Sequence, residues 1–163
     1  TLGEDNVSNI GPGLLVSDEQ DVIIFTLAEA NFLQAEAAHK SLLNTVSAKD
    51  AYENGVKASY NYLGANIGDY LTQATPLTNW AASPNKIEAI ITQKWIALNG
   101  INAAQSWFDY SRTGYPSGLP VSLQASTSDR PVRLAYPNSE ITGNPANVPS
   151  QPNVFTTKIF WAN

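Results

Sequence analysis

The sequence predicts an all-α fold: tetratricopeptide-like helical hairpins, with an extended proline-rich C-terminal tail packed over them. The first observation is helical spacing of apolar residues in four segments between residues 26 and 112, each bounded by residues that favour a helix end. The second is that seven of the ten prolines lie from Pro116 onward, where no helical period survives. A third observation is that the 163 residues, 43% of them hydrophobic, are enough for one core.

We therefore expect a single domain, residues 1–163, in three stretches. Residues 1–25 form an extended lead-in, because they hold three glycines and a proline early on and the short β-branched run 22–25 later. Residues 26–116 form the helical core. Residues 117–163 form an ordered, irregular tail, since the stretches 130–137 and 153–161 keep large apolar side chains that a disordered tail would lack. The tail carries at most a short strand near residues 132–135.

The first two predicted helices form a hairpin. Residues 26–43 carry two apolar stripes, which predicts contact on more than one side. Ser47 is the expected N-cap of the second helix, which runs to about Leu63 and ends at Gly64. On this helix Ala48, Tyr52 and Gly55 occupy the small, aromatic and small positions of a tetratricopeptide repeat. Only one copy is visible, so a degenerate repeat and an ordinary packed hairpin both remain open.

Two further helices are predicted on either side of Gly100. Ser83 is the expected N-cap of the first of them, with Pro84 at its first position. Asn102 is the expected cap of the second, which covers about residues 103–112 and is ended by Gly114 and Pro116.

Composition excludes several classes of function. The chain has no Cys, which removes disulfide scaffolds, thiolate metal sites and cysteine nucleophiles. A net charge of −5 gives no reason to expect nucleic acid as a partner. No apolar run approaches the ~20 residues of a membrane-spanning helix. The chain begins with Thr1 and contains no Met, so we expect a processed product or a fragment of a longer protein.

No catalytic site, metal site or cofactor is predicted. Glu29 and Glu36 lie seven residues apart, or ~10 Å along a helix, which exceeds the ~5–9.5 Å between the carboxyl groups of a glycosidase pair. The only histidine, His39, has no HExxH-type partner, and no nucleophile elbow, P-loop or dinucleotide fingerprint occurs. Lys94 lies within an apolar stripe, so we expect a structural lysine paired with Glu29, Glu36 or Asp109.

Aromatic rings and amides are the remaining candidates for ligand contact, and the chain has sixteen Asn. Trp95, Trp107 and Trp161 lie in predicted packing positions. Trp80 lies in a connection beside Asn79 with no obvious packing role, so it is the one candidate ligand-binding residue. Three arginines, Arg112, Arg130 and Arg133, are expected to tie the tail to the helices through Asp109 and Glu140, with an anionic ligand as the alternative.

Four stretches resemble, in order, the SusD/RagB-like family. They are AEANFLQAEA at 28–37, ITQKWIAL at 91–98, WFDYSRTGYP at 107–116, and a tail with PVRLAYPNSE at 131–140 and TKIFW at 157–161. Each motif is weak alone, and the combination is specific. The chain departs from the family pattern at Ser111, where a second arginine is common, and in a shortened stretch between residues 147 and 155.

The resemblance implies a non-catalytic lipoprotein on the bacterial outer surface, anchored through a segment outside this fragment. Such a protein captures oligosaccharides, or peptides in some members, for a TonB-dependent SusC-like outer-membrane transporter. The family is usually longer than this chain, and its N-terminal half contributes much of the ligand-binding surface. Two alternatives remain: a helical repeat scaffold that binds only protein, and a glycoside hydrolase domain, which the carboxylate placement disfavours.

Overall fold

The computed structural model describes residues 9–162 and contains five α-helices in that range. No β-strand occurs among these residues. The helices are α1 (Leu27–His39), α2 (Ala48–Tyr62), α3 (Lys86–Leu98), α4 (Ala103–Thr113) and α5 (Asn138–Gly143). The all-α prediction is therefore confirmed.

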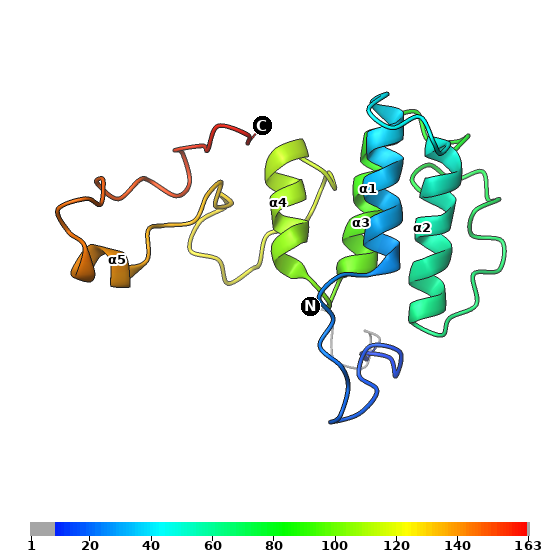
Figure 1. The fold of residues 1–163 in the computed structure, drawn as a ribbon, viewed down its shortest axis with the longest axis horizontal. Coiled ribbons are helices and arrows are strands. Elements are labelled where there is room, and N and C mark those ends of the chain that lie inside the picture. The colour runs from blue at the N-terminus through cyan, green and yellow to red at the C-terminus, as the bar shows by residue number, and fades with distance from the viewer. Residues whose placement is uncertain (1–8, 163) are drawn as a thin grey trace. The chain divides into compact units, whose positions relative to one another are not determined.

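The chain divides into two compact units, Thr1–Ser106 and Trp107–Asn163. In the first unit, α1 and α2 form the predicted hairpin, and α3 packs against both (Figure 1). The second unit contains most of α4, the short α5 and the irregular tail.

Local sequence signals placed most helix ends correctly. The Thr26 hydroxyl accepts a hydrogen bond from the Glu29 amide at 3.0 Å and begins α1. Ser47 does the same for α2 through the Asp50 amide at 3.2 Å. The predicted end of α2 is also confirmed, since Leu63 is the C-cap and Gly64 follows with φ +64°.

The predicted start of α3 was wrong by two residues. Asn85, rather than Ser83, is the N-cap, and its side chain accepts from the Glu88 amide at 3.1 Å. The Ser83 hydroxyl is already used within the preceding loop, where it accepts from the Leu77 amide and donates to the Asn79 carbonyl. Pro84 consequently lies outside the helix.

The N-terminal lead-in packs against the ends of α2 and α3. Gly13 lies so close to Leu63 that a Cβ there would be 2.1 Å from the Leu63 carbonyl oxygen. Next to it, the Leu14 side chain contacts the backbone at Gly100. The Gln20 side chain closes this loop by donating to the Leu14 carbonyl and accepting from the Val16 amide.

The core is centred on the crossing of α1 and α2. Phe32 and Tyr52 are each at most 1% exposed, and their rings meet edge to face at 6.2 Å. Gly55 permits this approach, because a Cβ there would lie 2.8 Å from the Phe32 ring. The small residue on α2 is therefore required by the aromatic residue on α1.

Hydrogen bonds connect two separate stretches of the tail. The Val132 amide donates to the Val154 carbonyl at 2.8 Å, and the Gln151 side chain binds both the amide and the carbonyl of Tyr136. These contacts align residues 132–136 with residues 151–154 and form no β-strand, which agrees with the expectation of at most a short strand near residues 132–135. The six-residue α5 was missed, because so short a helix shows no period in the sequence. That the tail packs over the helices stays a prediction.

Replacing Gly55 by valine should destabilise the chain by about 1–3 kcal/mol, because the added side chain overpacks the crossing against Phe32. Urea unfolding followed by circular dichroism measures this change. Asn61→Val on the exposed face of α2 is the matched control, expected within about 0.5 kcal/mol of the parent. Equal midpoints for both variants would contradict this account of the crossing.

Candidate ligand-binding surfaces

One carbonyl group in the loop between α2 and α3, that of Leu77, joins this loop to both flanking helices. It accepts hydrogen bonds from the Tyr52 hydroxyl at 2.7 Å and from the Gln93 side-chain amide at 2.8 Å. Leu77 adopts a φ of +69°, a left-handed conformation that side chains disfavour. The two bonds, one from each flanking helix, stabilise this conformation and so define the path of the loop that carries Trp80.

The buried, neutral Tyr52 hydroxyl donates hydrogen bonds to this loop. Burial, with a smaller contribution from neighbouring Tyr70, raises the pKa of the Tyr52 phenol far above its usual value of 10.0. The hydroxyl therefore remains protonated at neutral pH and donates to the Leu77 and Thr78 carbonyls.

Trp80 packs against the core, a role that the sequence did not indicate. Its half-buried ring lies 5.3 Å from the Tyr52 ring and 6.2 Å from the His39 ring at the end of α1. The Lys86 ammonium lies 5.2 Å from the indole centroid and donates to the Trp80 and Ser83 carbonyls. Contact between the remaining exposed part of the ring and a ligand stays a prediction.

The acidic residues of α1 form ion pairs. Lys94 lies 3.7 Å from Glu29, with side-chain exposures of only 2% and 5%, so the predicted structural pairing of Lys94 is confirmed. Glu36 forms an ion pair with Lys40, the C-cap residue of α1. The two carboxylates thus bind different cations, and both lie in structural contacts.

The three arginines were only partly anticipated. Arg112 pairs with Asp109 at 2.9 Å, but both residues belong to α4. The expectation for Arg130 and Arg133 was wrong, since within residues 9–162 neither forms an ion pair with Asp109 or Glu140. Arg130 donates to the Leu119 and Pro120 carbonyls, and Arg133 lies over the Tyr136 ring at 5.5 Å. Backbone carbonyls in the irregular tail supply acceptors that a sequence does not reveal.

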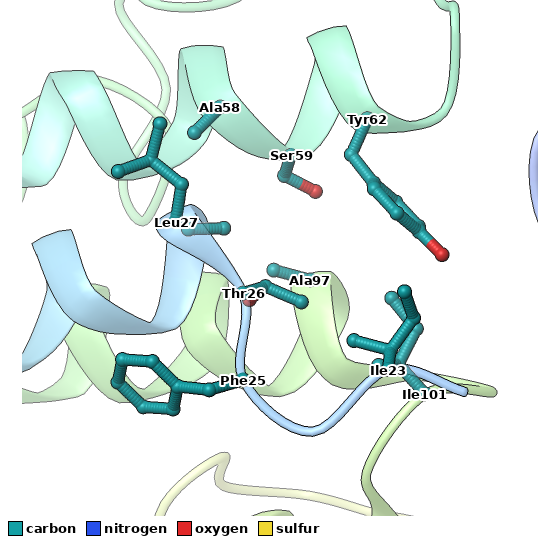
Figure 2. Close-up of a pocket in the computed structure, with 10 residues that line it drawn as sticks. Ile23, Phe25, Thr26, Leu27, Ala58, Ser59, Tyr62, Ala97 and Ile101 are labelled. Atoms are coloured by element: carbon teal, nitrogen blue, oxygen red, sulfur yellow. The ribbon is translucent and has the colours of Figure 1, made fainter. Parts of the chain in front are cut away.

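An apolar pocket of about 260 Å³ opens where the lead-in meets the three helices of the first unit (Figure 2). The Tyr62 side chain extends from α2 toward Ile23 and Ile101, and Phe25 lies near the start of α1 (Figure 2). The polar side chains in the wall are Thr26, Ser59 and Tyr62. Such a wall suits an aliphatic or aromatic group better than a sugar.

A second pocket of about 280 Å³, between α1 and the start of α2, has the opposite character. Amide, hydroxyl and carboxylate groups dominate its wall, which we call the amide pocket. It is lined by Asn31, Gln34, Thr45, Val46, Ser47, Asp50, Ala51 and Asn54. Amides can donate and accept hydrogen bonds, which matches the hydroxyl groups of a sugar.

The amide pocket was not predicted. One signal was available, since Asn31 and Gln34 are three residues apart and therefore share a face of α1. The contribution of α2 and of the connecting loop depends on how the hairpin closes, which no local pattern shows.

Comparison with known proteins identifies the class of protein. Residues 3–137 match a family of SusD-like proteins described as starch-binding and associating with the outer membrane. No curated protein matches the chain significantly. This chain belongs to the SusD-like family, as its motifs predicted.

Solved structures agree with this assignment. A SusD homologue from Bacteroides uniformis is 30% identical with a TM-score of 0.68, covering 83% of this chain and 36% of its own. Another from Bacteroides thetaiotaomicron is 31% identical with a TM-score of 0.63, covering 86% and 38%. A chitin-binding protein is 34% identical with a TM-score of 0.58, covering 72% and 27%. The chain thus spans little more than a third of the length of the first two structures.

The description of the matched family names an association with the outer membrane. Within residues 9–162, no helix is both long and apolar enough to cross a bilayer.

Replacing Lys94 by methionine should change the melting temperature without changing ligand affinity, because Lys94 acts by pairing with Glu29 inside the core. Removing one partner of a buried pair typically costs about 3–5 kcal/mol, and the methionine side chain offsets part of this loss by packing. Differential scanning calorimetry and a glycan titration measure the two effects. Lost binding at unchanged stability would instead place Lys94 at the ligand.

Proposed function

We propose that this chain is part of a non-catalytic surface component that captures glycans for uptake through a TonB-dependent outer-membrane transporter. The observation that carries the proposal is the match of residues 3–137 to a family described as starch-binding and associating with the outer membrane. The similarity to a chitin-binding protein supports a saccharide as the ligand.

The amide pocket supports a hydroxyl-rich ligand. No hydrogen bond to the Gln34 or Asn54 side chain occurs within the described residues, so both amides can bind a ligand without breaking an internal contact. The Asn31 amide already donates to the Leu27 carbonyl, which orients this side chain. Absence of catalysis is the corresponding proposal, since Glu29 and Glu36 lie in separate ion pairs.

The apolar pocket favours the second candidate, a helical scaffold that binds only protein. Its wall of aliphatic and aromatic side chains is typical of a surface that receives an apolar group from a partner. Glycan binding by the amide pocket separates the two candidates.

We expect the chain to bind malto-oligosaccharides or chitin oligosaccharides and to release no reducing sugar from them. The double variant Gln34→Ala/Asn54→Ala should lose about five- to 150-fold in affinity, because each lost neutral hydrogen bond contributes about 0.5–1.5 kcal/mol. Isothermal titration calorimetry measures binding, and a reducing-sugar assay measures hydrolysis.

Gln73→Ala, an exposed amide in the loop after α2, is the matched control and should bind as the parent does. A glycan titration of the Trp80→Ala variant, followed by intrinsic fluorescence, tests whether Trp80 contacts the ligand. Unchanged affinity in this titration would end the ligand role of Trp80. Absence of binding to every glycan, with retained binding to a protein partner, would favour the scaffold.

The transporter part of the proposal predicts co-purification. The parent protein, extracted from its native membrane in mild detergent, should bring down a large β-barrel protein in comparable amount. Recovery of the parent without a β-barrel partner, under conditions that retain other outer-membrane complexes, would contradict this part and leave glycan binding standing.

A further inference from the structure

The second unit contains a cavity of about 420 Å³ between the end of α4 and two stretches of the tail. This volume falls within the range of ~300–1,000 Å³ that is typical of small-molecule sites. We call it the tail cavity. It is lined by Tyr110, Ser111, Gly114, Arg130, Pro131, Val132, Lys158 and Ala162.

The wall of the tail cavity is positively charged. Arg130 and Lys158 contribute two cations, and none of the eight lining residues is acidic. The nearest acidic residue along α4, Asp109, is paired with Arg112 at 2.9 Å. Within residues 9–162, Lys158 forms no ion pair and its ammonium donates no hydrogen bond. The cavity therefore attracts an anion.

Hydrogen bonds from one guanidinium nitrogen hold Arg130 in place and leave other N–H donors available. Its Nη2 donates to the Leu119 and Pro120 carbonyls at 2.6 and 2.8 Å, and its guanidinium lies 5.6 Å from the Tyr110 ring centroid. Among the described residues, Nε and Nη1 donate no hydrogen bond. The side chain is thus held through Nη2, and Nε and Nη1 keep N–H groups that can each donate a charge-assisted hydrogen bond to an oxygen of a carboxylate or a sulfate.

Ser111 adds a third polar group. Its hydroxyl is buried and has no hydrogen-bond partner within residues 9–162, although it lines the tail cavity. A buried hydroxyl without a partner is costly, so the site is more stable when an acceptor oxygen enters the cavity. Ser111 and the two cations would then all bind the same negatively charged group.

We propose that the tail cavity binds the anionic group of an acidic saccharide, a sugar carboxylate or sulfate. Arg130 and Lys158 supply the charge, Ser111 donates a further hydrogen bond, and Pro131 and Val132 form an apolar wall for the sugar ring. This inference rests on the proposed glycan binding and narrows its ligand to saccharides that carry negative charge.

The test is an NMR titration of the full 163-residue chain with glucuronate, glucose and sodium sulfate at low ionic strength. Glucuronate should bind more tightly than either glucose or sulfate, with shifts at residues of the tail cavity. Lys158→Gln should weaken glucuronate binding about two- to fivefold, as expected for an exposed charge pair. Ser111→Ala should weaken it about two- to tenfold through the lost hydrogen bond.

Lys57→Gln, an exposed lysine on α2 with the same change of charge, is the matched control and should leave glucuronate binding unchanged. Equal affinity for glucuronate and glucose, or unchanged binding in both cavity variants, would overturn the inference. Sulfate binding as tight as glucuronate binding would overturn the assignment to a saccharide.

The titration also separates this inference from the proposed function. If neutral oligosaccharides bind through the amide pocket while glucuronate shows no preference, only the tail-cavity inference fails. If no saccharide binds, neutral or acidic, both fail.

Discussion

The shared acceptor at Leu77 joins the loop between α2 and α3 to both of its flanking helices. Two helices donate to the same carbonyl, Tyr52 from α2 and Gln93 from α3, and this fixes a loop that has no regular structure of its own. The position of Trp80 follows, because the loop places the indole ring against Tyr52. Without the two hydrogen bonds, nothing would offset the strain of the left-handed conformation at Leu77, and the folded-back path of the loop would be less stable.

The residues that identify the family differ from those that we propose for ligand contact. Gln93 and Lys94, adjacent in the most recognisable motif, are 5% and 1% exposed, and both bind groups on other segments. The amide pocket, by contrast, is formed by α1, a loop and the start of α2, and its wall carries accessible amide groups. The motif that identifies the family on α3 and the amide pocket proposed for a ligand thus lie on different helices.

The pockets of the two units differ in the chemistry of their walls. The amide pocket of the first unit is suited to neutral hydroxyl groups, whereas the tail cavity of the second unit is lined by cations and a buried hydroxyl. Each pocket lies within one unit, so each can be tested by variants that leave the other unit unchanged. This chain spans about a third of its relatives' length, and it still contains two candidate ligand pockets that can be tested independently.

The sequence by itself determined the all-α class, the hairpin of α1 and α2, most helix ends and the family. These features depend on caps, glycines and periodic apolar residues within one or two turns of each other. Only the tertiary structure decided that Ser83 forms hydrogen bonds within the loop and that Trp80 packs on Tyr52. It also decided that Lys94 pairs with Glu29 among three candidate carboxylates. The same holds for the amide pocket and the tail cavity. Each of these contacts, apart from the local one at Ser83, joins residues from separate segments, whose approach depends on packing that no local pattern encodes.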